Sequence, residues 1–579
     1  MNLNQSVRLS ELPKVSVPRS KFDKSHKHTT TFNVGRLVPV FCSEVLPGQT
    51  TQIDTSVVIR LQTLLRPLMD NLYLDTYFFF VPNRIIWDHW EEFMGENSDS
   101  AWIPQVEHHK PTLTASPNGF SPYSLADYFG LPIKVGGIKV DHLPFRAYSK
   151  IVDLYFRDEN LQTPIPIATG DNSFRALSDS DSSFDDQISC LQLGGAPFIA
   201  GKYHDRFTSC MPYPQKHSDV LLPMTGVLPV FPTVHEWTRM DLVGPNPDAA
   251  NPFVYPLMGS LSTDSRLVAS ESGPNSGFSH SKTGALQVTN YVGSTSNGNN
   301  AGVTQSYFYP TNLAVDIGEG VSASINDLRM SLALQRLYER DAMYGSRYSE
   351  QLLGQFGVRS ADYRLDRPEF LGGDHIPMNI TQVMNLASPQ VEDGAPLGHV
   401  GGMSLTGKIH KDVMQSFTEH GWIIGLAVVR YEHSYQQGIN KMWSRFDRLD
   451  YYYPVFAEIS NQPVLQKEIF STGQASDDNV FGYQEAWYDY RYGDYNHVTG
   501  EMRSNNPQTL DSFHLADFYS SSPSLSADWI HEDMNNVDRV LAVDSDVANQ
   551  VMADFYFQQY DTLPLPLYSI PTLDSNFIK

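Results

Sequence analysis

Two short stretches resemble loops that bind phosphate or metal ions, and each lacks a residue that the chemistry requires. Gly195–Lys202 (GAPFIAGK) is similar to a phosphate-binding loop, but it is one residue too long, and Tyr203 stands where Ser or Thr would hold Mg²⁺. Ser178–Asp186 is similar to a calcium loop, yet Phe184 replaces the required glycine and Cys190 the final glutamate. A turn and an exposed acidic loop are the better interpretations.

Hydrolytic motifs are also incomplete. His235-Glu236 and His531-Glu532 begin like a metalloprotease helix, but neither has the second histidine that would put two ligands on one helix face. The G-x-S-x-G nucleophile motif does not occur. With 65 acidic residues a carboxylate pair could form in space, but nothing in their order selects one. The sequence therefore predicts no catalytic residue and no cofactor.

The sulfur and imidazole groups also suggest no metal centre. Cys42, Cys190 and Cys210 are few and widely separated, which excludes a disulfide framework and fits a reducing cytoplasm. His108-His109 are interpreted as exposed polar residues rather than ligands. No metal site is expected.

Charge is unevenly distributed along the chain. The formal net charge is −24, whereas residues 1–28 hold six basic and two acidic residues. An acidic body repels phosphates over most of its surface, but a basic N-terminal arm, residues 1–33, could contact a nucleic acid or remain a solvated terminus. The DNA-contact candidates are Arg8, Lys14, Arg19, Lys21, Lys24 and Lys27.

The elements that must position these groups are clearest in the segment Leu72–Met94. Leu72–Val81 alternates with apolar residues on both faces, which predicts a strand covered on both sides, as in a sandwich. After the turn at Pro82, Ile86–Met94 repeats apolar residues at helical spacing, which predicts a short helix ending at Gly95.

Further patterns predict a mainly β fold, a jelly-roll sandwich with large loop and helical insertions whose first and last strands lie close. Strand patterns cover Val34–Val45, Gln52–Leu61, Ile376–Met384, Met403–His410, Gly421–Tyr431 and Ala548–Gln558, and helical patterns cover Ser124–Phe129, Phe145–Phe156 and Ser324–Tyr344. The longest apolar run, Trp422–Val429, is too short to span a membrane, and the N-terminus lacks the apolar region of a signal peptide.

A long polar stretch interrupts this pattern. Between Gly259 and Ser306, Gly, Ser, Asn and Thr fill 28 of 48 positions, so this part cannot bury much apolar surface. We therefore expect an arm (1–33), a first core part (34–225), a surface insertion (226–320) and a second core part (321–579).

Aromatic segments are the remaining candidates for binding. Asp450–Phe456 (DYYYPVF) and Trp487–Tyr495 (WYDYRYGDY) suit either stacking on unpaired bases or contacts between subunits, and their acidic residues favour subunit contacts. The candidates for core or interface positions are Trp87, Trp90, Tyr435 and Trp443.

Several blocks along the chain resemble one protein family in its own order. They are PRSKFDKSHKHTTTFNVGRLVPV (18–40), EVLPGQT (44–50), FFFVPNRIIWDHWEEFMGE (78–96), YHDRFTSCMPYPQKH (203–217), LALQRLYERDAMYGSRYSEQL (332–352), RPEFLGG (367–373), GWIIGLAVVRYEHSYQQGINKMWSR (421–445) and FGYQEAWYDYRYGDYNHVTGEMRS (481–504). The family is the major capsid protein of the gokushoviruses, small tailless single-stranded-DNA phages of the Microviridae. A single block of this kind is modest support for the resemblance, whereas a series of blocks in the family's own order is specific to that family.

The resemblance implies a structural protein that is not an enzyme. The family's fold is a single eight-stranded antiparallel jelly roll, and 60 copies form a T=1 icosahedral shell around circular single-stranded DNA. The expected partners are other copies, the genome without sequence specificity, a small DNA-binding protein, a pilot protein and a host surface receptor. Assembly is expected in the host cytoplasm and the final location is the virion.

The same resemblance gives the polar insertion a role. Gokushovirus capsids carry a long insertion that projects at the three-fold axes toward the host, and residues 226–320 fit it in length, position and low hydrophobicity. Ser276, Tyr291 and Asn299 are the host-contact candidates.

Two other classes stay open. A receptor- or carbohydrate-binding β-sandwich, such as a phage spike, would share the aromatic residues and polar loops but would not need the basic arm. A glycoside hydrolase would need a carboxylate pair that the sequence does not reveal, and a screen on polysaccharides would detect it.

Overall fold

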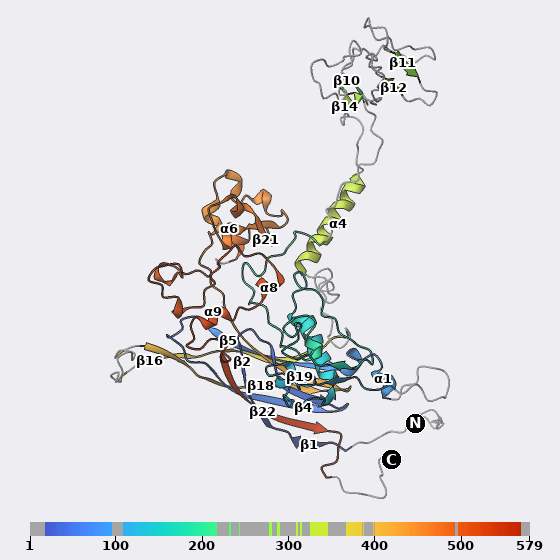
Figure 1. Cartoon of the computed structure of the whole chain (residues 1–579), viewed down its shortest axis with the longest axis vertical. Coiled ribbons are helices and arrows are strands. Elements are labelled where there is room, and N and C mark those ends of the chain that lie inside the picture. Colours follow the sequence, from blue (N-terminus) through green and yellow to red (C-terminus); the bar gives the residue numbers. More distant parts are fainter. Residues whose placement is uncertain are drawn as a thin grey trace, which may run out of the picture. The chain divides into compact units, whose positions relative to one another are not determined.

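The computed structural model (Figure 1) describes residues 18–94, 108–216, 366–384, 386, 398, 400–492 and 496–568, with the backbone of helix α4 (Ile325–Tyr344) and of six short strands between residues 231 and 314. Side chains of α4 are described from residue 328 to residue 340. Contacts divide the chain into a larger unit, Met1–His217 with Tyr338–Lys579, and a smaller unit, Ser218–Leu337. The described elements are mainly antiparallel strands, as the sequence predicts.

One sheet of the larger unit joins strands from both ends of the chain. Its order is β1, β22, β4 and β18, with β2 also paired to β22, and every pairing is antiparallel. The bounds are Ser20–Asp23 (β1), His26–Phe32 (β2), Thr50–Leu61 (β4), Thr406–Ser416 (β18) and Val551–Leu563 (β22). The predicted proximity of first and last strands is therefore confirmed. From residue 18 onward the expected arm is extended, but it is hydrogen-bonded into this sheet.

The second sheet contains the strand that the sequence analysis singled out. Its order is β15, β5, β19 and β3, again antiparallel, with bounds Glu369–Pro377, Leu72–Pro82, Gly421–Tyr431 and Val38–Val45. On β5, Leu74 and Phe78 belong to one hydrophobic cluster, whereas Phe79 and Val81 belong to another. The prediction that this strand is covered on both sides is confirmed.

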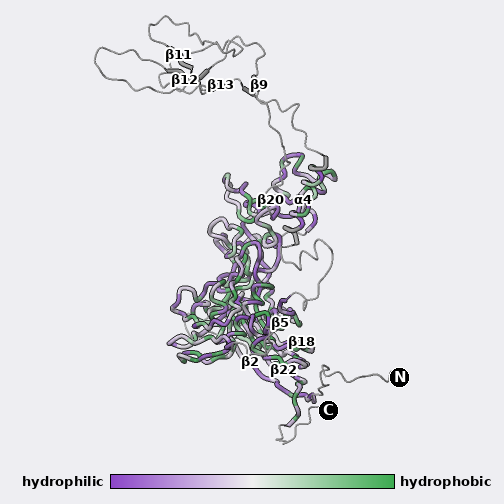
Figure 2. The backbone as a smooth tube through the Cα atoms, turned by 90° about the vertical axis from the view of Figure 1, so that its right-hand side faces the viewer, coloured by the Kyte–Doolittle hydropathy of each residue, from purple (hydrophilic) through white to green (hydrophobic). Residues whose placement is uncertain are grey.

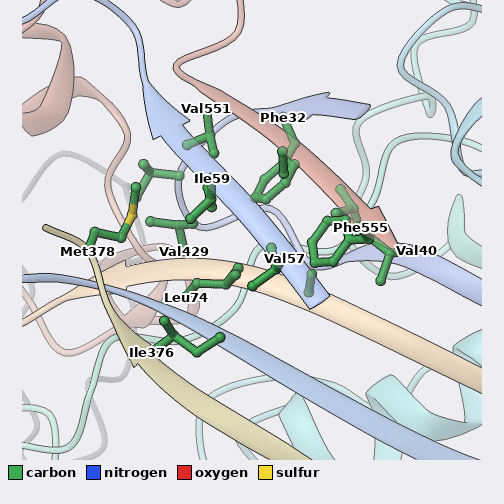
Figure 3. Packing of buried hydrophobic residues seen from close by; sticks show 14 of the residues in the cluster. Phe32, Val40, Val57, Ile59, Leu74, Ile376, Met378, Val429, Val551 and Phe555 are labelled. Carbon is green, nitrogen blue, oxygen red and sulfur yellow. The ribbon is translucent and has the colours of Figure 1, made fainter. Parts of the chain in front are cut away.

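Side chains from both sheets share one core. Val57 and Ile59 of β4 lie in the same cluster as Leu74 of β5 and Val429 of β19 (Figure 3). On β4 every second residue is buried, because alternate side chains of a strand point to opposite faces. Each buried aliphatic side chain contributes about 1.5–3 kcal/mol. The cluster therefore holds the two sheets face to face, an arrangement compatible with a β-sandwich.

Helices and short strands cover the outer face of the second sheet. Phe145 and Tyr148 of α3 lie in the cluster with Phe79, and the Tyr148 hydroxyl donates to the Leu37 carbonyl at 2.7 Å. The elements of this layer are η1 Asn83–Ile85, α1 Trp90–Phe93, β6 Thr112–Thr114, α2 Leu125–Tyr128, β7 Lys139–Asp141, α3 Leu143–Ile151, the π-helical turn η2 Val152–Phe156, β8 Phe174–Arg175 and η3 Leu191–Leu193.

The helix expected over Ile86–Met94 is reduced to the single turn α1. The reason is a tertiary contact: the backbone N–H of Asp88 donates to the Thr169 carbonyl at 3.0 Å instead of to a helical carbonyl, and the Trp87 indole donates to Asp171 at 2.7 Å. These two bonds hold the chain out of a helix until Trp90.

A third cluster joins Phe207 to Tyr435 and Tyr488 of the later part of the larger unit. The elements of the later part are β16 Ile380–Met384, β17 Val400–Ser404, η5 Lys441–Ser444, η6 Arg448–Asp450, η7 Pro454–Phe456, β20 Gln462–Leu465, α6 Gln466–Ile469, η8 Ala475–Asp478, β21 Val480–Gln484, α7 Tyr488–Arg491, η9 Gly500–Met502, η10 Asp511–Phe513, α8 Ala527–Ile530 and α9 Asn535–Asp538.

The smaller unit is described as pairs of short strands. The antiparallel pairs are β10 (Leu242–Val243) with β13 (Tyr309–Pro310), β11 (Gly277–His280) with β12 (Leu286–Thr289), and β14 (Leu313–Ala314) with β9 (Phe231–Pro232).

Hydrophobic and hydrophilic residues are interleaved along the described chain (Figure 2). Among the described residues, no helix is both long and apolar enough to cross a membrane.

Candidate functional site

The described surface carries a run of exposed apolar side chains at residues 440–459, here called the apolar segment. Its most exposed members are Val455 at 87%, Phe446 at 86%, Leu449 at 69% and Trp443 at 68%. Met442, Tyr451, Tyr452 and Ile459 are also exposed. Exposed apolar side chains gathered in one segment typically mark an interaction site, because leaving them in water is unfavourable.

Local hydrogen bonds fix the backbone of the apolar segment while its apolar side chains face outward. The Asn440 side chain accepts from the Met442 N–H at 3.1 Å. The Asp450 carboxylate accepts from the backbone N–H groups of Phe446 at 2.9 Å and Asp447 at 2.8 Å, and these bonds lower the pKa of Asp450. These bonds cap the turns η5 and η6, and the two turns set the direction of the exposed side chains.

Arg445 ties the apolar segment to α7. Its guanidinium pairs with Asp489 and lies 4.4 Å from the centre of the Tyr490 ring. The Trp487 indole donates to the Phe456 carbonyl at 2.8 Å. A surface held in this way loses little conformational entropy on binding, which favours association.

The four aromatic candidates occupy two different environments. Trp87, Trp90 and Tyr435 are buried in hydrophobic clusters, and the Tyr435 hydroxyl also donates to Asp205 at 2.5 Å. Trp443 instead projects from the apolar segment. Of the segments expected to bind through aromatic residues, Asp450–Phe456 falls within this exposed surface.

The basic candidates that the structure describes lie on or beside β1 and β2, next to acidic and aromatic residues of β22. Lys24 pairs with the buried Asp561 at 2.9 Å, and Lys27 pairs with Asp554 at 2.8 Å. The Lys21 ammonium lies 4.1 Å from the centre of the Tyr560 ring, and Arg19 donates to the Gly48 carbonyl. The candidates Arg8, Lys14, Ser276, Tyr291 and Asn299 lie outside the described residues.

A buried ionic network is a feature that the sequence analysis missed. His433 donates to Asp517 and to Glu532, both at 2.9 Å, and Lys202 approaches the second oxygen of Asp517 at 3.4 Å. Burial opposes a charge on His433, but the two carboxylates outweigh it and raise its pKa to about 10. Since the partners are 84 and 99 residues away, no local pattern could reveal them.

A second missed cluster joins His89, Glu92 and His108, and it is the one group of metal-ligand type found among the described residues. The only local signal was the spacing of His89 and Glu92, one helical turn apart.

Comparisons with known proteins show the family of this chain and several similar proteins. The family model described as capsid protein (F protein) matches residues 10–573. The chain belongs to this phage capsid family. Capsid protein VP1 of Spiroplasma virus 4 is 40% identical over 561 residues, covering 96% of each chain. Capsid protein VP1 of Chlamydia phage 1 is 36% identical over 98% of this chain and 97% of its own, and that of Bdellovibrio phage phiMH2K is 34% identical over 98% of each.

Membership in the family establishes the function at a coarse level. The chain is a structural capsid protein of a Microviridae-type bacteriophage and a component of the virion, and it is not an enzyme. The predicted family resemblance is confirmed. A capsid is an oligomer, so the exposed apolar segment is a candidate for the contact between copies.

Proposed function

We propose that 60 copies of this chain form a T=1 icosahedral shell around circular single-stranded DNA, assembled in the host cytoplasm. The observation that carries the proposal is the near full-length similarity to capsid proteins of three phages. A fixed apolar surface on each copy supports it, because many weak contacts acting together make a closed shell stable.

The fold proposed for each copy is a jelly roll with insertions. Two antiparallel sheets share one core, and the first strands pair with the last described strand. Within this fold, residues 1–33 form the arm, 34–225 and 321–579 form the core parts, and 226–320 form the insertion. We assign host attachment to that insertion, with Ser276, Tyr291 and Asn299 as contact residues.

The apolar segment is proposed as a subunit contact. The variant Trp443→Ser/Phe446→Ser should fold but assemble poorly, because the exposed side chains contribute to the contact and not to the core of a single copy. Val547→Ser is a matched control, since Val547 is 81% exposed and lies outside the apolar segment. Equal particle yield from the two variants, measured by sedimentation, would contradict this assignment.

The genome contact is proposed for the basic arm, with the small DNA-binding and pilot proteins as further partners. Lys and Arg would neutralise phosphates without reading bases. Lys21→Gln/Lys27→Gln should reduce the DNA packaged per particle. Lys467→Gln is the control, because Lys467 lies outside the basic arm and, like Lys27, pairs with a carboxylate on the surface. Unchanged DNA content in the double variant would contradict the genome role.

Electron microscopy of the purified particles, with extraction of nuclease-protected nucleic acid, tests the proposal as a whole. Uniform icosahedral particles holding circular single-stranded DNA are expected. A monomer or small trimer without nucleic acid would overturn the shell and favour the receptor-binding spike instead.

A further inference from the structure

The cluster at the start of α1 consists of two histidines and two carboxylates. His89 immediately precedes α1 and Glu92 lies one turn later, so both face the same side of the chain. His108 comes from a separate segment and stacks on His89, with ring centres 4.1 Å apart and an angle of 15° between the planes. One potential ligand atom from each of His89, Glu92 and His108 lies within 4.8 Å of the others.

Asp171 orients both imidazole rings. One of its oxygens contacts Nδ1 of His89 at 2.9 Å and the other contacts Nδ1 of His108 at 2.8 Å. The Trp87 indole donates to the same carboxylate at 2.7 Å, which anchors it. A carboxylate that accepts from Nδ1–H leaves the lone pair of a neutral imidazole on Nε2. Metal-binding histidines are commonly prepared in this way.

The second carboxylate, that of Glu92, stands where a ligand is needed. The Nε2 atom of His108 lies 2.9 Å from a carboxylate oxygen of Glu92. Around a tetrahedral Zn²⁺, with bonds of about 2.0–2.2 Å, neighbouring ligand atoms are roughly 3.3 Å apart. An ion could therefore replace the proton shared by His108 and Glu92 after a shift of a few tenths of an ångström. The ligand atom of His89 lies within 4.8 Å of theirs, and a movement of His89 toward the ion that keeps its Nδ1 on Asp171 would complete the set.

We propose that His89, Glu92 and His108 bind a divalent transition-metal ion of the Zn²⁺ class, with Asp171 as the positioning residue. Imidazole and carboxylate ligands together suit Zn²⁺, whereas Ca²⁺ and Mg²⁺ prefer oxygen ligands alone. Three protein ligands leave a fourth position for water or for a group from another molecule. The ion would crosslink α1 to the segments that carry His108 and Asp171 and so stabilise the outer layer of the larger unit.

Calorimetric titration of the full-length, chelator-treated protein with Zn²⁺ tests the proposal. One ion per chain is expected. His108→Ala should weaken binding at least 100-fold, and Asp171→Asn about 10–100-fold, the range found for residues that orient metal ligands. His109→Ala is the matched control, because it removes the adjacent exposed histidine and should leave the affinity unchanged.

Two further measurements separate metal binding from general damage to the fold. Zn²⁺ should raise the unfolding temperature of the wild-type protein and of His109→Ala but not of His89→Ala or Glu92→Gln, because a ligand stabilises only the state that binds it. Co²⁺ should give the visible absorption of a tetrahedral site in the same two proteins. Wild-type affinity no higher than that of His89→Ala/His108→Ala, or equal loss in His109→Ala, would overturn the proposal.

Discussion

At the scale of single residues, His433 shows how the fold sustains a charge in its interior. The side chains of His433, Asp517 and Glu532 are almost completely removed from solvent, and the ring of Tyr431 lies 4.4 Å from that of His433. Removing one partner of such a buried set leaves an uncompensated charge, which typically costs about 3–5 kcal/mol. The network therefore links the strand end at residue 431 to two distant loops.

The network predicts a pH dependence of stability. Since folding raises the pKa of His433 from 6.5 to about 10, the stabilisation due to its protonation is fully present below about pH 6.5 and is lost as the pH rises toward 10. The unfolding temperature of the wild-type protein should fall over this range. His433→Gln should be less stable at pH 6.5 and show a smaller fall, measured by calorimetry. An equal fall in both proteins would contradict the assignment.

Substitution of two tryptophans should change the stability of a single copy by very different amounts. Trp87 is fully buried, so Trp87→Ala should cost about 3–5 kcal/mol. Trp443 is 68% exposed, so Trp443→Ala should change stability by less than about 0.5 kcal/mol. Denaturant unfolding of the unassembled protein measures both. Comparable losses would mean that Trp443 supports the fold of one copy rather than contacts between copies.

At the scale of elements, β1 and β2 protect the edge of β22. Both strands pair with it over residues 20–32, and Thr29 also donates to Asp554 at 2.8 Å. Without them β22 would expose a long row of unpaired backbone groups, which templates aggregation. The N-terminal segment thus has a structural role whatever it contributes to genome binding.

Truncation separates these two roles of the N-terminal segment. A chain that begins at residue 34 should unfold at a lower temperature and aggregate, because it lacks both strands. A chain that begins at residue 18 retains them and should keep wild-type stability while lacking Arg8 and Lys14. Light scattering during thermal unfolding distinguishes the two. If both truncated chains behave like the full chain, the pairing with β22 is dispensable.

At the scale of the whole molecule, the chain combines a sandwich-like unit with a second unit built from residues 218–337. The elements of the two sheets that share the core lie outside the smaller unit. A change within the smaller unit therefore leaves the residues of this core unchanged. This division suits the host-attachment role proposed for the insertion.

Replacement of residues 226–320 by a short Gly/Ser linker tests this division. Particles should still form, because the core residues of the larger unit are unchanged. Adsorption to host cells should be lost, because the proposed attachment surface is removed. A control with the same residues replaced by the equivalent stretch of a related phage should form particles and follow the host range of the donor. Failure of both variants to assemble would mean that the insertion is part of the shell.

The sequence by itself determined the position of several long strands, but it missed β1 and β2 and read Ile376–Met384 as one strand where the structure has the end of β15 and the whole of β16. Period-2 alternation in Leu72–Val81 and the apolar character of Gly421–Tyr431 correctly predicted β5 and β19, because the alternation of side chains along a strand is a local property. The ordered sequence blocks were also enough to identify the family, because such a match depends only on which residues occur and in which order. The helix over Ile86–Met94 was predicted too long, because a distant carbonyl takes up the Asp88 N–H.

Only the tertiary structure decided which distant residues meet. The sequence predicted that the first and last strands lie close, but the pairing of β22 with β1 and β2 and its register came from the structure, and the network of His433 joins three separate segments. The cluster of His89, Glu92 and His108 likewise depends on Asp171, which lies 82 residues from His89. Local periodicity shows which face of an element is apolar, but long-range partners follow from the path of the whole chain and the packing of its core.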